Sequence, residues 1–167
     1  MPILTEDMKR VVREQTLGFV ATVCPDGTPN LSPKGTTTVW DDDHLVYADL
    51  ASPGTAANLA ANPAVEVNVV DVVTRTGYRF KGRGEVHVDG PVFEEVVAFY
   101  KRDRQLAPSR VRGVVIIRVE TAAPLISPAY DLAGRDEIVD RSLRRLEHVY
   151  GIRIVGTGDA PAGELGD

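Results

Sequence analysis

The stretch "LGFVATVCPDGT", residues 17–28, decides the fold, because it predicts a strand followed by a tight turn. Apolar residues fall on both faces of residues 17–24, which is typical of a strand buried on both sides. The residues "PDGT" favour a turn, so the chain is expected to reverse there. Residues 17–24 and the segment from Thr28 onward are therefore expected to form an antiparallel hairpin.

The next stretch, "PNLSPKGTTTVW" at residues 29–40, is an unusual continuation of this hairpin. Proline lacks an N–H donor and glycine offers no side chain for packing, so Pro33 and Gly35 are expected to open the ladder and expose the backbone. "HLVYADL", residues 44–50, predicts another strand. Three antiparallel strands in succession indicate a barrel or meander.

Four segments carry helix signals. Thr5 is a plausible N-cap for a helix over residues 5–15, and Ser52 followed by Pro53 starts a short helix that Asn62-Pro63 ends. Asp89 caps a third helix beginning at Pro91. The fourth, residues 136–150, is amphipathic and places four residues at core spacing: Val139, Leu143, Leu146 and Tyr150.

Residues 64–71, 77–89 and 112–120 predict the remaining strands. In residues 77–89 the apolar and glycine residues share one face, and the charged residues share the other. "KGRGEV" therefore belongs to a strand and is not a phosphate-binding loop. About six strands without a repeated βα rhythm argue against a Rossmann-like sheet and favour a mainly β fold, a small antiparallel barrel with peripheral helices.

Composition limits the function classes. The 167 residues are 43% hydrophobic and 26% charged, so we expect one soluble domain over residues 1–155, followed by a mobile tail at residues 156–167. A net charge of −5 gives no general attraction to nucleic acid or anionic membranes. No apolar run is long enough to cross a bilayer, and the cytoplasm is the expected location.

Nucleophile and metal motifs are not evident. Cys24 is the single cysteine, and the three histidines (His44, His87 and His148) share no spacing typical of a metal site. GxSxG, Walker A and GxGxxG motifs do not occur. No residue is assigned as a catalytic acid, base or metal ligand.

Small polar and basic groups nevertheless recur at positions that suit an anion. A helix N-terminus with hydroxyl side chains is a natural phosphate site, and lysine supplies a compensating charge. Two simpler interpretations stay open: Ser52 as a plain N-cap, and the basic residues as a solvated strand face. The candidates are Ser32, Lys34, residues 36–38, Ser52, Thr55, Arg79 and Lys81.

The order of three motifs resembles the flavin-binding split β-barrel family of pyridoxamine 5'-phosphate oxidase. They are "ATV" at residues 21–23, "DGTP" at 26–29 and "NLAANPAV" at 58–65. The resemblance covers about residues 17–88. It implies a six- or seven-stranded antiparallel split barrel of the FMN-binding type, and a homodimer with FMN at the subunit interface.

The same resemblance assigns cofactor-binding positions. Residues 32–37 on the second strand would line the flavin ring and ribityl chain, with Lys34 near the ring or phosphate. Residues from the third strand, the phosphate-binding helix start and the later strand would complete the site. The implied set is Ser32, Pro33, Lys34, Gly35, Thr36, Thr37, Tyr47, Ala48, Ser52, Thr55, Asn58, Arg79 and Lys81.

Two departures from the family pattern bear on the reaction. Pro53-Gly54 stands where the biosynthetic oxidase has an Arg-Lys pair, and Trp40 is the only tryptophan, so the family's C-terminal closing segment is not evident. The sequence thus favours an FMN-dependent oxidoreductase acting on an unidentified small molecule. A flavin-binding or electron-transfer module and a relative that binds a deazaflavin or heme stay open as alternatives. Heme is the least favoured, because no histidine is well placed.

Overall fold

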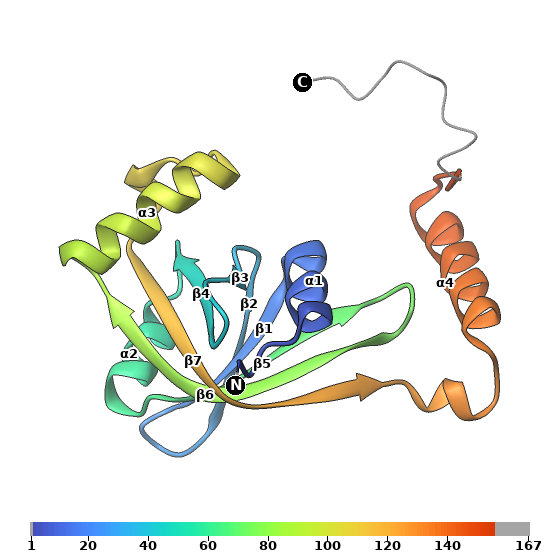
Figure 1. The fold of residues 1–167 in the computed structure, drawn as a ribbon, viewed down its shortest axis with the longest axis horizontal. Helices are drawn as coiled ribbons and strands as arrows, with labels where there is room; N and C mark the ends of the chain where they lie inside the picture. The colour runs from blue at the N-terminus through green and yellow to red at the C-terminus, as the bar shows by residue number, and fades with distance from the viewer. Residues whose placement is uncertain (1, 156–167) are drawn as a thin grey trace. The chain divides into compact units, whose positions relative to one another are not determined.

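The computed structural model describes residues 2–155 and is built on one curled, seven-stranded sheet (Figure 1). All pairings are antiparallel, and the strand order is β2–β1–β5–β6–β7–β4–β3. This is the mainly β split barrel that the sequence predicts. The strands are β1 (Gly18–Val23), β2 (Pro29–Lys34), β3 (Thr38–Val39), β4 (His44–Asp49), β5 (Ala64–Asp71), β6 (Thr76–His87) and β7 (Gly113–Ile126).

Four α-helices accompany the sheet: α1 (Glu6–Gln15), α2 (Pro53–Ala61), α3 (Gly90–Arg104) and α4 (Arg135–Tyr150). Two short 3-10 turns, η1 (Pro108–Arg110) and η2 (Pro128–Asp131), precede and follow β7. The Thr5 hydroxyl accepts a hydrogen bond from the Met8 N–H, which confirms the predicted cap of α1. Asp89 precedes α3 as expected, but its side chain makes no capping bond.

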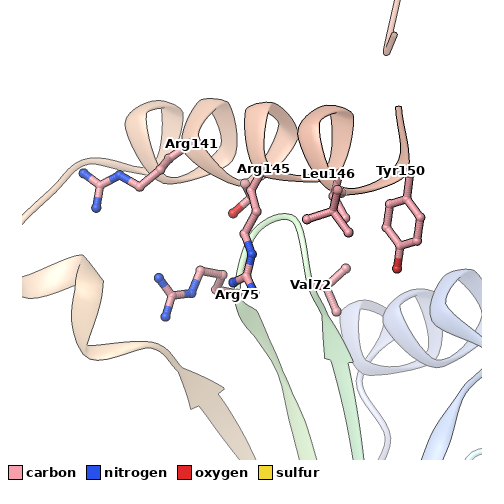
Figure 2. Close-up of a pocket in the computed structure, with 8 residues that line it drawn as sticks. Val72, Arg75, Arg141, Arg145, Leu146 and Tyr150 are labelled. Carbon is pink, nitrogen blue, oxygen red and sulfur yellow. The ribbon is translucent and has the colours of Figure 1, made fainter. Parts of the chain in front are cut away.

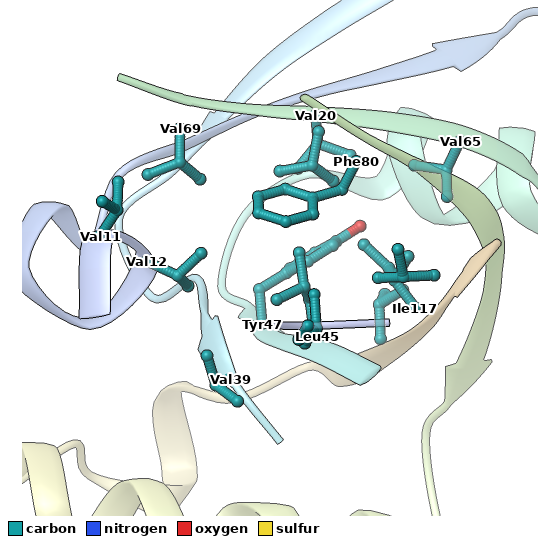
Figure 3. Packing of buried hydrophobic residues seen from close by; sticks show 14 of the residues in the cluster. Val11, Val12, Val20, Val39, Leu45, Tyr47, Val65, Val69, Phe80 and Ile117 are labelled. Atoms are coloured by element: carbon teal, nitrogen blue, oxygen red, sulfur yellow. The ribbon is translucent and has the colours of Figure 1, made fainter. Parts of the chain in front are cut away.

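Two apolar clusters hold the sheet and its helices together. Val20, Phe80 and Tyr47 lie in the larger cluster inside the curled sheet, which α1 closes with Val11 and Val12 (Figure 3). The smaller cluster lies under α3, whose buried residues are Val96 and Tyr100, and against β4 and β7. Burial of these side chains is the main contribution to stability.

The structure corrects the interpretation of residues 29–40 as one strand opened by Pro33 and Gly35. Pro33 lies inside the β1–β2 ladder opposite Phe19, and the ladder ends only after Lys34. Proline is tolerated there because β2 is an edge strand. Beyond Gly35 the chain crosses to β3, at the other end of the strand order, so of the expected barrel or meander the chain forms the barrel.

The strand buried on both faces is β4 and not β1. Along β1, Phe19 and Val23 are exposed on the outer face. Along β4, Leu45 and Tyr47 enter the larger cluster, and Val46 and Ala48 enter the smaller one. Both strands carry apolar residues on both faces. They differ in burial because β4 contributes to both apolar clusters, whereas β1 contributes only to the larger one.

β6 contains the glycines of "KGRGEV" and confirms that this segment is a strand. A Cβ at Gly82 would lie 1.9 Å from the carbonyl oxygen of Arg118, at a register shift between β6 and β7. Glycine is therefore required by the close approach of two backbones. β7 runs to Ile126, six residues beyond the predicted end, because it keeps pairing with β6 after this bulge.

The described chain forms two compact units, one of residues 2–71 and 76–126 and the other of residues 72–75 and 127–155. Within the second unit, Ile138 is the buried residue of α4, whereas Tyr150 is 68% exposed and not the core residue expected. The single domain over residues 1–155 stays a prediction, and the predicted mobile tail lies outside the described residues. None of the described helices has the length and apolarity needed to span a membrane.

Candidate functional site

The inner face of β2 carries a row of polar side chains. Asn30, Ser32 and Lys34 alternate with more exposed neighbours, as the period of a strand requires. The Lys34 side chain is buried, with the residue only 5% exposed, and its Nζ donates to the Ser32 Oγ at 2.9 Å. The ammonium also lies 5.4 Å from the centre of the Tyr47 ring, within the range of a cation–π contact.

The charge of Lys34 is poorly compensated within the described residues. Burial lowers the pKa of Lys34, and the carboxylate of Asp49 offsets this only in part by favouring the charged form. The Tyr47 Oη is buried and has no hydrogen-bond partner among residues 2–155. Burial raises the pKa of Tyr47, and Asp49 raises it further, so the phenol stays protonated. A cation that is only partly compensated therefore lies beside the ring of a tyrosine whose hydroxyl has no partner in the described chain.

The turn after Lys34 is fixed firmly to the rest of the sheet. Thr37 donates from its N–H and its Oγ1 to the Lys34 carbonyl, at 3.3 and 2.9 Å. The Thr36 hydroxyl donates to the Ala48 carbonyl at 2.9 Å and accepts from the Ala48 N–H at 3.1 Å. Tyr100 of α3 donates to the Thr36 carbonyl at 2.8 Å. The structure thus brings residues 32–37, Tyr47 and Ala48 together.

The start of α2 approaches the other end of the β2 row. Ser52 holds the N-cap position, but its side chain makes no capping bond, and its N–H donates to Asp49 Oδ1 at 2.9 Å. Thr55 is buried and its Oγ1 accepts from Asn30 Nδ2 at 3.3 Å. The N–H groups of the first turn of a helix have no acceptor within the helix, so this end suits an anion.

Asn58 has a structural function in the chain as it stands. Its Nδ2 donates to Thr22 Oγ1 at 3.1 Å and approaches Cys24 Sγ at 3.5 Å. Asn30 donates to the same Thr22 oxygen at 3.1 Å. Asn58 therefore fastens α2 to the β1–β2 hairpin, and its predicted contact with a phosphate stays a prediction.

Arg79 and Lys81 lie on the outer face of the sheet, opposite the side that carries Lys34. Cross-strand registers place Pro33, Phe19, Asn68 and Arg79 in one row. Both cations contact the carboxylate of Glu66, Arg79 Nε at 2.8 Å and Lys81 Nζ at 3.4 Å. Within one chain, the structure does not bring these two residues together with Lys34.

Sequence reasoning missed three residues of this region: Asp49, Asn30 and Thr22. Asp49 is a buried carboxylate that orders the start of α2 and affects the pKa values of Lys34 and Tyr47. An acid three residues before an N-cap serine was a usable signal. Asn30 was also identifiable, because strand alternation places it on the face of Ser32 and Lys34.

No group of three or more His, Cys, Asp or Glu side chains in residues 2–155 is arranged to hold a metal ion. His44 contacts Asp41 at 2.8 Å, and His87 contacts Glu85 at 3.5 Å. Both histidines therefore interact with acids close to them in the sequence.

Residues 4–124 match the family described as pyridoxamine 5'-phosphate oxidase. The chain belongs to this family. It is also similar to the crystal structure of HupZ from Group A Streptococcus, with 32% identity and a TM-score of 0.66 over 74% of this chain and 94% of that one. No curated protein matches the chain.

Two further solved structures share the fold of this family member. An F420 reductase is 23% identical with a TM-score of 0.56, covering 71% of this chain and 98% of the other. An FMN-binding protein from Syntrophomonas wolfei is 14% identical with a TM-score of 0.60, covering 72% and 85%. These likenesses agree with the split barrel described above.

Proposed function

We propose that this member of the pyridoxamine 5'-phosphate oxidase family binds FMN and acts as an FMN-dependent oxidoreductase on a small molecule. The observation that carries the proposal is the buried Lys34, whose only hydrogen-bond partner within the described residues is the Ser32 hydroxyl. A buried cation without a carboxylate partner is costly unless an anion completes its surroundings. FMN offers a phosphate and a polar ring edge.

The residues present fit such a group. Lys34 and Ser32 provide donors at one end of β2, and the start of α2 provides N–H groups near Asn30. When bound, FMN supplies the hydride and electron-transfer chemistry. The chain's own contribution is to balance charge with Lys34 and to present the backbone of residues 35–37, which Thr36 and Thr37 hold rigid.

The proposal includes a homodimer with the cofactor at its interface. The outer face of β1 and β2 exposes Phe19, Val23 and Leu31, the last at 65%. Exposed apolar patches of this kind are typical of subunit interfaces. Arg79 and Lys81 share that face, so they can reach a flavin only if it is held largely by the other subunit.

Titration of the purified protein with FMN, followed by quenching of flavin fluorescence, tests the binding. Lys34→Ala is expected to weaken FMN binding by about 1–3 kcal/mol, the range for a hydrogen bond to a charged group. Lys101→Ala removes an exposed lysine from the last turn of α3 and serves as the matched control. A wild-type protein without affinity for FMN, or a Lys34→Ala protein with unchanged affinity, contradicts the proposal.

A deazaflavin is the second candidate cofactor, favoured by the fold shared with an F420 reductase. The same titration with FMN and with its 5-deaza analogue compares the two ring systems directly. Tighter binding of FMN is expected. If the protein clearly prefers the 5-deaza analogue, a deazaflavin becomes the proposed cofactor in place of FMN.

Turnover separates an oxidoreductase from a flavin-binding or electron-transfer module. NADH and NADPH consumption by the FMN-loaded protein is measured with and without an added electron acceptor. Consumption that depends on bound FMN is expected, whereas none with any donor favours the module. The cytoplasmic location expected from the sequence stays a prediction.

A further inference from the structure

A pocket of about 460 Å³ lies within the second unit, between the turn that joins β5 to β6 and one face of α4 (Figure 2). The turn contributes Val72 and Arg75, and α4 contributes Arg141, Arg145, Leu146 and Tyr150. Small-molecule sites commonly measure roughly 300–1,000 Å³. None of the residues predicted to bind the flavin lines this pocket, so it is a separate place on the chain.

The pocket concentrates positive charge in a chain whose net charge is −5. Three of its lining side chains are arginines and none is a carboxylate. Arg141 forms an ion pair with Glu137 at 2.6 Å, whereas Arg75 and Arg145 form none among residues 2–155. Arg145 extends from α4 toward the turn that carries Arg75 (Figure 2). Arginine side chains that line one pocket without a carboxylate among them favour an anionic ligand.

The other end of the pocket is apolar. Leu146 and Tyr150 point from α4 toward Val72 on the turn (Figure 2). Val72 is 64% exposed although it lines a concave surface. An aromatic ring and two aliphatic side chains at one end, with arginines at the other, match a ligand that is itself divided into an apolar and an anionic part.

We propose that this arginine pocket binds a small organic anion, in which a carboxylate, sulfonate or phosphate group is joined to an aromatic body. The anionic group lies at the arginine end of the pocket, and the aromatic body lies against Tyr150, Leu146 and Val72. Arg75 lies in the tight turn between β5 and β6, where its backbone has a left-handed conformation with φ of 57°. The site is independent of the proposed flavin site.

Fluorescence titration of the full chain with 8-anilinonaphthalene-1-sulfonate, an aromatic sulfonate, tests the proposal. Saturable binding of one probe per chain is expected, unchanged by excess FMN. The double variant Arg75→Asn, Arg145→Gln is expected to weaken it by about tenfold or more, since two charge-assisted contacts are lost. Asparagine tolerates the left-handed conformation and glutamine keeps the helix, so the fold is preserved.

Arg144→Gln is the matched control, because Arg144 neighbours Arg145 on α4, pairs with Asp140 at 2.5 Å and does not line the pocket. Its affinity for the probe is expected to equal that of the wild type. N-phenyl-1-naphthylamine, which lacks the sulfonate, is expected to bind more weakly than the sulfonate and equally to all variants. Equal losses in the control and the double variant, an unaffected double variant, or displacement of the probe by FMN each overturn the proposal.

Discussion

At the scale of single residues, burial of Lys34 is expected to lower the stability of the unliganded protein while it favours binding of an anion. Its ammonium is removed from water. It makes one hydrogen bond to a hydroxyl, one cation–π contact and an electrostatic interaction with Asp49. Without a ligand, these interactions do not fully replace the lost hydration of the charge, and the pKa of Lys34 is lowered for this reason. The group that best supports anion binding is therefore a source of instability in the unliganded protein.

Lys34→Met is expected to stabilise the unliganded protein by about 1 kcal/mol, because an apolar side chain of similar length replaces a buried charge. Urea unfolding at pH 7 measures the change. FMN affinity is expected to fall in the same variant, as it does in Lys34→Ala. A less stable Lys34→Met protein contradicts this account of the lysine's burial.

The pH dependence of stability has a definite sign. Because the folded pKa of Lys34 lies below its ordinary value of about 10.5, the unfolded chain binds more protons between these two values. The penalty is fully present below the folded pKa, and it is lost as pH rises to the ordinary value. The free energy of unfolding of the wild type, measured relative to Lys34→Met by urea titrations, is expected to increase across that window. If the difference in the free energy of unfolding between the two proteins does not change with pH, this assignment to Lys34 is contradicted.

Two polar residues of α2 are expected to differ in their effect on stability. Asn58→Ala removes the hydrogen bonds that join α2 to Thr22 and Cys24, so the free energy of unfolding falls by about 1–3 kcal/mol. Ser52→Ala removes a side chain that makes no capping bond, so the loss stays within about 0.5 kcal/mol. Thermal unfolding of both variants checks this. A larger loss in Ser52→Ala contradicts the observed cap geometry.

At the scale of elements, helix boundaries and strand alternation were predictable because both follow from local signals. Thr5, Pro53 and Asn62 mark helix ends where the structure has them. The sequence did not predict that β4, and not β1, is buried on both faces. Both strands carry apolar residues on both faces, and this pattern does not show what covers each face. The crossing after Gly35 was also not predictable, because local sequence does not show that β3 pairs at the far end of the strand order.

Gly82→Ala tests the close approach of β6 and β7. The new Cβ would lie 1.9 Å from the Arg118 carbonyl oxygen, so the strands must separate, at a cost of roughly 3 kcal/mol or more. Gly54→Ala in α2 meets no atom within 4 Å and is expected to add about 0.5–1 kcal/mol of stability. Chemical unfolding of both variants gives the comparison. Equal stabilities in the two proteins contradict the role of the bulge.

At the scale of the whole molecule, the sequence predicted the barrel and most of the polar row, but not the division of the candidate site. Alternation predicts that Arg79 and Lys81 share the polar face of β6, and the structure places that face outside the sheet, in agreement with the interpretation of a solvated strand face. Their pairing with Glu66 depends on the β5–β6 register, which the sequence does not give. The family resemblance implies one site built from residues of both faces, and the proposed second subunit would bring these residues together.

Leu31→Arg tests that second chain. Leu31 is 65% exposed on the outer face of β2, opposite Ala21, and an arginine there places an uncompensated charge in the proposed interface. Light scattering is expected to show a dimer for the wild type and a monomer for Leu31→Arg.

Leu132→Arg makes the same change at a leucine that is 90% exposed in the second unit, and it is expected to stay dimeric. FMN affinity is the decisive companion measurement. Lys34→Ala is expected to lose affinity as a dimer, whereas Leu31→Arg is expected to lose affinity together with the dimer, because Arg79 and Lys81 then face no partner. If monomeric Leu31→Arg protein binds FMN as tightly as the wild type, Lys34 and its neighbours on the inner face form the whole site, and the outer-face cations do not belong to it.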